Sequence, residues 1–181
     1  MTVLIPVADG SESLETVALV NVLRRAELQV CVASIGASLE IQATRGIRLL
    51  ADARYADLDG REFTAIVLPG GESGARALAA HAPLVERLKQ QRLAHRWFGG
   101  ICAAPALVLA PHGLLDGKKA TCYPSFREQL LHWVDQPVVV DGHCITSQGP
   151  ATAIAFGLEW LTQLAGEEVQ RKVASAMLAS P

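Results

Sequence analysis

Residues Arg96 to Leu109, with the sequence RWFGGICAAPALVL, place a cysteine between a short apolar strand and an alanine- and leucine-rich helix. Pro105 falls in the first turn of that helix, where a proline costs no hydrogen bond. Two glycines precede Cys102 and small residues follow it, which is the layout of a nucleophile elbow with sulfur in place of a serine oxygen. The helix amides beyond such a turn favour a thiolate, so the pattern predicts a lowered pKa for Cys102. A lone cysteine is more often a core residue, but this position favours a reactive thiol.

The composition indicates one globular domain over residues 1–181, because 181 residues are enough to bury a core without disulfides. Half of the residues are apolar and the net charge is −2, so no basic region indicates specific nucleic-acid binding. No apolar stretch reaches the roughly 20 residues that a membrane span needs. Asp9-Gly10 interrupts the first apolar run too early for a signal peptide. We therefore expect a cytoplasmic protein without membrane contact.

Apolar strand patterns alternate with helical patterns along the chain. This alternation predicts an α/β fold with a doubly wound, mostly parallel sheet flanked by helices. A small hairpin or an excursion from the sheet, not a helix, is expected over residues 39–51. The predicted strands cover residues 2–7, 29–34, 63–68, 96–101, 118–122, 138–140 and 144–147. The predicted helices cover residues 14–26, 73–91 with a break near 82–83, 103–112, 123–131, 150–164 and 167–178.

Candidate functional residues follow three of these strands. In a doubly wound sheet the working site lies beyond the carboxyl ends of the strands. Glu15 follows the first strand, the Gly70-Gly71 turn follows the strand at 63–68, and Cys102 follows the strand at 96–101. We expect them to converge, with the amides of Gly70, Gly71 and Ala103 forming an oxyanion hole beside the sulfur.

The helix expected at residues 14–26 carries two apolar stripes, Leu14-Val17-Ala18 and Leu19-Val22-Leu23-Ala26. A helix that covers only a sheet needs one stripe. The second stripe therefore favours burial against a partner chain in a homodimer, although a larger core would produce the same pattern.

The cysteines give no sign of a disulfide framework or a metal centre. Cys31, Cys102, Cys122 and Cys144 are scattered, without the paired spacing of a zinc site. His143 and Cys144 are adjacent and would point to opposite faces of a strand. We expect no metal and no cofactor.

Several motifs in order resemble the ThiJ/PfpI superfamily along nearly the whole chain, and most of all the clade of the parkinsonism-associated deglycase and bacterial YajL. They are ESLETV at residues 12–17, LPGG at 68–71, GICAAP at 100–105 and TSQGP at 146–150, with Arg25-Ala26 and Thr44-Arg45-Gly46 as further matches. The resemblance implies a flavodoxin-like fold, as in class I glutamine amidotransferases.

The resemblance also implies roles for residues. Cys102 would be the reactive thiol and Glu15 its carboxyl partner, protonated so that it donates to the sulfur instead of repelling it. Tyr123 stands where a human relative has a histidine near the pocket, and Arg45 would bring positive charge to the site across a dimer contact. Ala103 stands where the protease-like branch has a histidine, which disfavours a cysteine protease or amidase.

Two functions are compatible with these residues. The first is a stress-protective enzyme, a deglycase or glyoxalase, in which the Cys102 thiolate attacks small dicarbonyls or their early adducts on proteins and nucleotides, with Glu15 moving the proton. The second is a redox sensor or chaperone that is switched when Cys102 is oxidised to a sulfinate. Cys122 neighbours the Tyr123 position and is either a second oxidisable thiol or a small core residue.

Overall fold

The computed structural model describes residues 1–179 and contains a seven-stranded sheet in the order β5-β2-β1-β6-β7-β9-β8. Every neighbouring pair is parallel except β8 and β9. The prediction of a doubly wound, mostly parallel sheet is therefore confirmed. The strands are β1 (Thr2–Val7), β2 (Gln29–Ser34), β5 (Ala53–Arg54), β6 (Ala65–Leu68), β7 (Trp97–Ile101), β8 (Val138–Asp141) and β9 (Cys144–Ser147).

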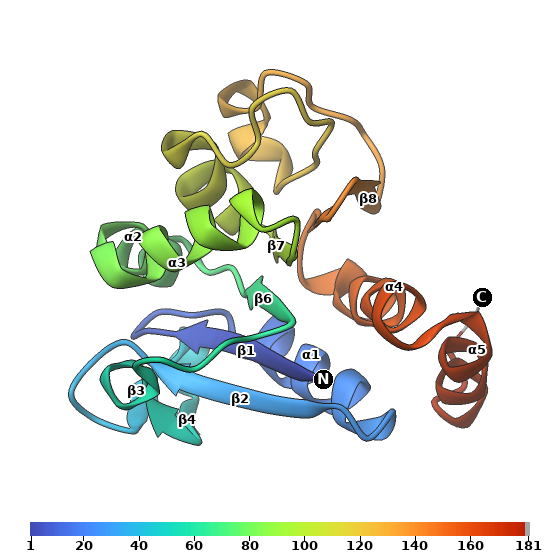
Figure 1. Ribbon diagram of the computed structural model, residues 1–181, viewed down its shortest axis with the longest axis horizontal. Coiled ribbons are helices and arrows are strands. Elements are labelled where there is room, and N and C mark those ends of the chain that lie inside the picture. The colour runs from blue at the N-terminus through green and yellow to red at the C-terminus, as the bar shows by residue number, and fades with distance from the viewer. Residues whose placement is uncertain (180–181) are drawn as a thin grey trace.

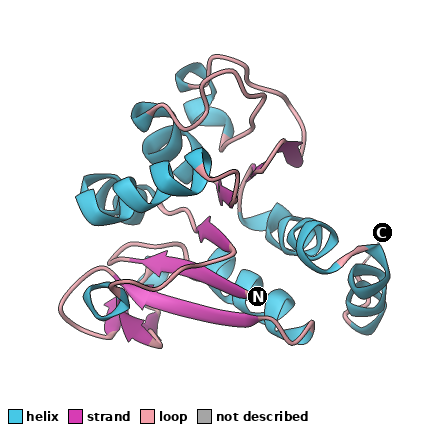
Figure 2. Ribbon diagram, in the orientation of Figure 1, coloured by secondary structure: helices cyan, strands magenta, loops and turns pink. Residues whose placement is uncertain are grey.

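The central strands are apolar on both faces because helices cover both faces of the sheet (Figures 1 and 2). Alternate residues of β1 point to opposite sides. Leu4 belongs to the core under α2 (Glu72–Ala80) and α3 (Ala82–Leu93). Val3 and Ile5 belong to the core under α1 (Ser13–Arg25), α4 (Ala153–Ala165) and α5 (Glu167–Ala176). The helix boundaries predicted for these five segments are confirmed within a few residues.

The contact between α1 and α4 is close because α4 carries a glycine at the crossing. A Cβ added to Gly157 would lie 3.0 Å from the side chain of Val22, which is fully buried on α1. Leu19 and Leu23 pack in the same core. The inner of the two apolar stripes predicted on this helix therefore faces α4 and the sheet.

A two-stranded hairpin is attached to the start of α1. It consists of β3 (Glu40–Gln42), a 3₁₀ turn (Thr44–Gly46) and β4 (Arg48–Leu50), as the sequence predicts. Thr44 donates its amide to the Ser11 carbonyl at 3.0 Å, and Ser13 donates its amide to the Thr44 hydroxyl at 3.2 Å. These bonds fix the hairpin against the loop that joins β1 to α1.

The segment after Cys102 differs from the prediction of one regular helix. It forms a π-helical turn (Pro105–Leu109) and then a 3₁₀ turn (Ala110–His112). Pro111 has no amide hydrogen, so it cannot continue the hydrogen-bond ladder of an α-helix. Gly113, with φ of +71°, then ends the helical segment.

The predicted strand over residues 118–122 is wrong, and the helix predicted over residues 123–131 is present only as a shorter 3₁₀ helix. Figure 2 shows mostly loops and short turns in this part of the chain, between the helical turns that follow Cys102 and β8. Ala120 makes a single bridge with Trp133, and Pro124–Gln129 is a 3₁₀ turn. The Thr121 amide bonds to the side chain of Thr146 at 2.9 Å, not to a neighbouring main chain, so no ladder forms.

Within residues 1–179, no helix combines the length and the apolar character needed to cross a membrane.

Candidate active site

Cys102 lies at a sharp turn directly after β7 and has a left-handed backbone, with φ of +62°. Such a conformation is uncommon for a residue with a side chain and persists only where the surroundings hold it. Its amide donates to the Ser147 carbonyl at 2.9 Å, and its carbonyl accepts from the Tyr123 amide at 2.8 Å. The nucleophile-elbow geometry expected from the sequence is therefore present, and main-chain bonds on both sides of Cys102 fix it.

Glu15 lies in the first turn of α1 and has no exposed surface. Its Oε2 atom accepts a 2.7 Å hydrogen bond from the Gly70 amide. Its Oε1 atom is buried and has no oxygen or nitrogen partner among the described residues. The carboxyl group lies close enough to the Cys102 side chain for each group to shift the pKa of the other. The structure therefore places Glu15 beside Cys102, as the sequence predicts.

The environment of Glu15 favours its protonated form. Burial raises the pKa of Glu15 from 4.5 to about 7, against the opposing effects of the Gly70 amide and the Cys102 contact. Nearby Glu12 raises it further. A carboxyl group with this pKa can hold or release a proton near neutral pH.

The predicted lowering of the Cys102 pKa is wrong. Burial and then the negative charge of Glu15 raise the pKa of Cys102 to about 12, whereas the amides of Gly71 and Ala103 lower it. Burial has the largest effect on this pKa, so the two amides reduce the rise without reversing it. When both groups are protonated, the pair holds two protons. It loses one of them near pH 7 and retains the other, so the pair as a whole carries one negative charge at moderately alkaline pH.

The three amides expected to form an oxyanion hole have different roles. Those of Gly71 and Ala103 are directed at the Cys102 sulfur. That of Gly70 is occupied by Glu15, so Gly70 holds the carboxyl group in place and is not a free donor. A Cβ at Gly70 would lie 2.5 Å from the Cys102 Cβ, so only glycine fits there.

Tyr123 lies close to the site and Arg45 does not join it within one chain. The Tyr123 amide bonds to the Cys102 carbonyl, and its side chain is 45% exposed next to Gly149. Arg45 is exposed on the left-handed turn of the hairpin, with φ of +59°. Within the described residues no hydrogen bond or ion pair connects Arg45 to Cys102 or Glu15. Arg45 therefore makes no polar contact with the Cys102–Glu15 pair in the described part of the chain.

Sequence reasoning missed the part that Ser147 plays in positioning Cys102. Its carbonyl accepts the Cys102 amide, so that amide is not available to a substrate. The strand predicted over residues 144–147 was the available signal, because Ser147 is its last residue. β9 pairs with β7 in parallel, so the carboxyl end of β9 must lie beside Cys102.

Cys102 is the most accessible of the four cysteines. Cys31, Cys122 and Cys144 are buried, and burial raises the pKa of Cys122 to about 11 and that of Cys144 to about 12. Across residues 1–179, no three His, Cys, Asp or Glu side chains are grouped as a metal site.

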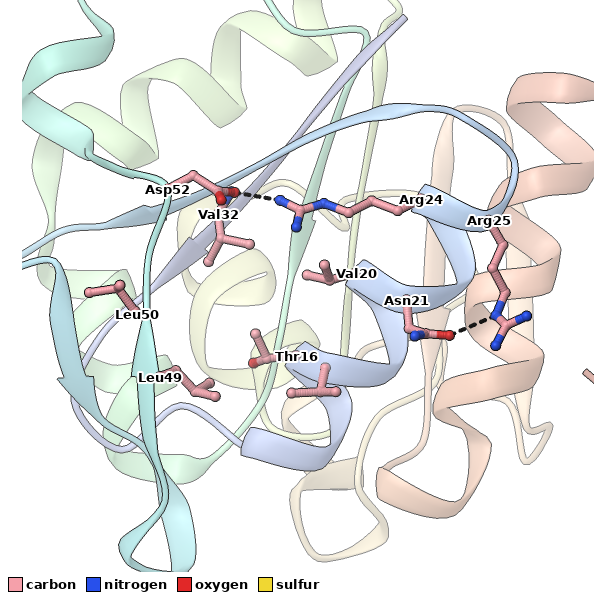
Figure 3. A pocket seen from close by; sticks show the side chains of 10 residues that line it. Thr16, Val20, Asn21, Arg24, Arg25, Val32, Leu49, Leu50 and Asp52 are labelled. Carbon is pink, nitrogen blue, oxygen red and sulfur yellow. Dashed lines mark hydrogen bonds and ion pairs between the residues drawn. The ribbon is translucent and has the colours of Figure 1, made fainter.

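A groove of about 570 Å³ runs along the outer side of α1, between that helix, β2 and β4 (Figure 3). In Figure 3, Val20 projects from α1 into this groove and Leu49 lines its hairpin side. The ion pair between Arg24 and Asp52, at 2.7 Å, lies at one end. Leu14 and Val17, from the outer apolar stripe, are 54% and 51% exposed. This stripe is uncovered in a single chain.

Comparison with known proteins adds to this geometry. The profile of the DJ-1/PfpI family matches residues 1–163. The chain is 43% identical over 178 residues to protein DJ-1 homolog B of Arabidopsis thaliana, which covers 97% of this chain and 41% of that protein. It is 31% identical over 184 residues to the Schizosaccharomyces pombe protein named glutathione-independent glyoxalase DJ-1, covering 94% of this chain and 95% of that one. The solved structure described as "Toxoplasma gondii DJ-1, oxidized" has a TM-score of 0.98 and 35% identity, with 99% of both chains covered. The chain spans less than half the length of the Arabidopsis relatives that it matches.

The raised pKa of Glu15 predicts how stability depends on pH. Deprotonation costs more in the folded chain, so the stability contributed by protonated Glu15 is complete below about pH 4.5 and is lost as the pH rises to about 7. At 1.36 kcal/mol per pKa unit the loss is at most about 3 kcal/mol. We expect Glu15→Gln, which cannot ionise, to gain stability relative to the wild type over this range, measured as the free energy of unfolding in urea. A difference that does not change between about pH 4.5 and 7 would contradict the raised pKa.

Proposed function

This chain belongs to the DJ-1/PfpI family, and on that premise we propose that it is a cysteine-dependent enzyme acting on small dicarbonyls such as methylglyoxal. The family expected from the sequence motifs is confirmed. The observation that carries the proposal is the close placement of Glu15 and Cys102, in which burial raises the pKa of Glu15 to about 7 and that of Cys102 to about 12. The glyoxalase name of the Schizosaccharomyces pombe relative supports the same class of substrate.

In the proposed reacting form, the proton is on Oε1 of Glu15 and the charge is on the Cys102 sulfur. Oε1 is buried and has no other partner among the described residues, whereas Oε2 is already bonded to the Gly70 amide. A hydrogen bond to a charged acceptor is about twice as strong as a neutral one. Protonation of Glu15 also removes the negative charge that raises the pKa of Cys102, leaving the Gly71 and Ala103 amides to stabilise the sulfur.

The proposed reaction begins when the sulfur attacks the aldehyde carbon of methylglyoxal. A carbon–sulfur bond forms, and the proton of Glu15 passes to the aldehyde oxygen to give a hemithioacetal. Glu15, now a carboxylate, removes the hydrogen of that carbon as a proton while the hydroxyl proton passes to the ketone oxygen, which gives an enediolate. Glu15 then returns its proton to the former ketone carbon, and the product is a thioester with a hydroxyl group on the neighbouring carbon. Water then cleaves the carbon–sulfur bond and lactate is released. The sum is methylglyoxal plus water to lactic acid, with no outside oxidant or reductant.

On an early glycation adduct the Cys102 sulfur would displace the amine or thiol from the former aldehyde carbon. The carbon–sulfur bond to Cys102 forms as the bond to the amine or thiol breaks, and the leaving group takes up the Glu15 proton. This is the deglycase form of the activity. The partly exposed Tyr123 ring near Cys102 is the proposed contact for such substrates.

A second candidate function, redox sensing with a chaperone or partner-binding readout, rests on the orphaned Oε1 atom of Glu15. Each peroxide would transfer one oxygen atom to Cys102 and leave as water, and two transfers give the sulfinate. A protonated Oε1 would donate to a sulfinate oxygen as it would to the thiolate. The solved structure of the Toxoplasma gondii relative is of an oxidized form, which supports this chemistry for the family site.

We further propose that the protein is a homodimer whose interface covers the outer stripe of α1. Leu14 and Val17 are large apolar side chains that a single chain leaves uncovered, and the adjoining groove has an apolar wall. The loop with Arg45 lies against the start of this helix, since Thr44 bonds to Ser11. A partner seated on α1 would therefore meet that loop and bring Arg45 toward a site.

Replacing Glu15 tests where the shared proton lies. In the proposed reacting form Glu15 is neutral and donates to the sulfur, so we expect Glu15→Leu, which removes that donor, to raise the pKa of Cys102 and slow its alkylation near neutral pH several-fold. Glu15→Gln, which retains an N–H donor, should have the smaller effect. The measurement is the rate of iodoacetamide alkylation of Cys102 against pH, read by mass spectrometry. If both variants lower the pKa of Cys102, the charge lies on Glu15 and the proposed reacting form is wrong.

Steady-state release of lactate from methylglyoxal, in metal-free buffer with little free amine, tests the enzymatic proposal. We expect many turnovers per chain, a loss of at least about 10²-fold with Cys102→Ser, and little change with Cys122→Ser. Release of no more than one equivalent of lactate, with two oxygen atoms added at Cys102 by mild peroxide, would favour the sensor instead.

Sedimentation at micromolar concentration tests the homodimer. We expect a two-chain species for the wild type and a monomer for Val17→Asp, which places a charge in the apolar stripe. Leu131→Asp is the matched control, since Leu131 is 86% exposed and lies in the loop segment before β8. A monomeric wild type would remove the proposed route by which Arg45 reaches a site.

A further inference from the structure

We propose that His95 and His143 form a binding site for one divalent transition-metal ion of the copper, nickel and zinc class. No metal site is expected from the sequence, in which the cysteines lack zinc spacing and His143 and its neighbour Cys144 would point to opposite faces of a strand. The fold brings His143 beside His95, which is 48 positions earlier in the chain. The pair lies at the amino end of β7 and β9, opposite the edge that carries Cys102.

Both histidines are held by main-chain bonds. His95 has a left-handed backbone, with φ of +51°, and its amide donates to the Arg92 carbonyl at the end of α3. The His143 carbonyl accepts the Phe98 amide at 3.0 Å, which fixes the turn between β8 and β9 against β7. The register of β7 and β9 then determines how far apart the two imidazoles lie.

The distance between the rings suits shared coordination. Their centroids are 6.1 Å apart, and the ring planes meet at 61°. Metal–nitrogen bonds of about 2.0–2.1 Å bring two imidazole centroids to about 4.5–5.5 Å when both bind one ion. Both side chains are exposed, so rotation about their side-chain bonds can provide the remaining approach of about 1 Å.

The surroundings are compatible with a cation. The pair lines a cavity of about 330 Å³ together with Glu62, Thr64 and Trp97. His95 directly follows the carboxyl end of α3, where the helix dipole favours positive charge. The positive charge of Arg96 is paired with Glu62 at 3.1 Å.

The ligand set, two imidazoles without a third protein ligand, determines which metal ions the site would prefer. In the described part of the chain no third His, Cys, Asp or Glu side chain completes a cluster, so water fills the remaining positions. Neutral imidazole suits copper, nickel and zinc, and for a given nitrogen site affinity is highest for Cu²⁺. Cu²⁺ is therefore the most sensitive probe.

Trp97 provides a readout that does not depend on activity. Its ring centroid lies 5.0 Å from that of His143. A paramagnetic ion bound at the pair should therefore quench Trp97 fluorescence. The test is a Cu²⁺ titration of the full chain carrying Cys102→Ser, which removes the reactive thiol, followed by calorimetry and by tryptophan fluorescence.

We expect one equivalent of Cu²⁺ to bind with partial quenching. His95→Ala and His143→Ala should each raise the dissociation constant at least about tenfold, because one of two ligands is lost. Trp97→Phe should retain the calorimetric binding and lose most of the quenching. His132→Ala is the matched control, since His132 is exposed elsewhere and should leave both signals unchanged.

The inference is overturned if no equivalent binds below about 100 µM Cu²⁺, or if it binds equally well to the His95 and His143 variants. Both histidines are exposed, and unchanged circular dichroism of each variant excludes loss of fold as the cause. A second titration in the presence of Zn²⁺ tests whether Zn²⁺ competes with Cu²⁺ for this site. Competition indicates a site for the whole class of ions, and its absence indicates a site that accepts copper alone.

Discussion

The crowding around Gly70 is the constraint on which the site depends. A side chain at this position would collide with the Cys102 Cβ at 2.5 Å and with the Glu15 Oε2 at 2.7 Å. Because glycine has no side chain, the ends of β1, β6 and β7 can approach one another here. The Gly70 amide then holds the Glu15 carboxyl group beside the Cys102 thiol. Glu15, Gly70 and Cys102 come from three segments that are distant in sequence. The parallel sheet aligns their carboxyl ends, and Gly70 removes the last steric obstacle.

This closeness also sets the electrostatics of the pair. A thiol and a carboxyl group that share one dry space cannot both ionise at moderate cost, so together they retain a proton. The Gly71 and Ala103 amides act in the opposite direction, but each contributes a partial charge to a sulfur that has lost much of its water. The same confinement that makes the pair useful for proton transfer therefore limits how readily either group becomes charged.

The sequence predicted the sheet, the five helices that cover it and the convergence of Glu15 with Cys102, because strands with apolar residues on both faces have few other arrangements. It did not predict the pKa of Cys102, since burial is a sum over many contacts and no local motif reports it. It also assigned the Gly70 amide to a substrate. The glycine pattern shows that the turn leaves an amide accessible, but it does not show that the Glu15 side chain accepts a hydrogen bond from that amide. The errors over residues 118–131 have another origin. Lys118 to Cys122 has strand-like composition, but Thr121 bonds to a side chain of β9, and Tyr123 bonds to the elbow.

The antiparallel direction of β8 has a consequence for the variety of reactions that such a fold can support. To enter β8 from the opposite end, the chain after the elbow must travel across the carboxyl edge of the sheet, and on the way it brings Tyr123 to Cys102. This crossing contributes only one bridge to regular pairing. Its buried residues, such as Ala120 and Cys122, belong to the core, but its exposed side chains, that of Tyr123 among them, can change without altering the sheet register or the buried pair. Evolution can in this way reshape the entrance to the thiol, and with it the choice of substrate, while the chemical groups beneath stay in place.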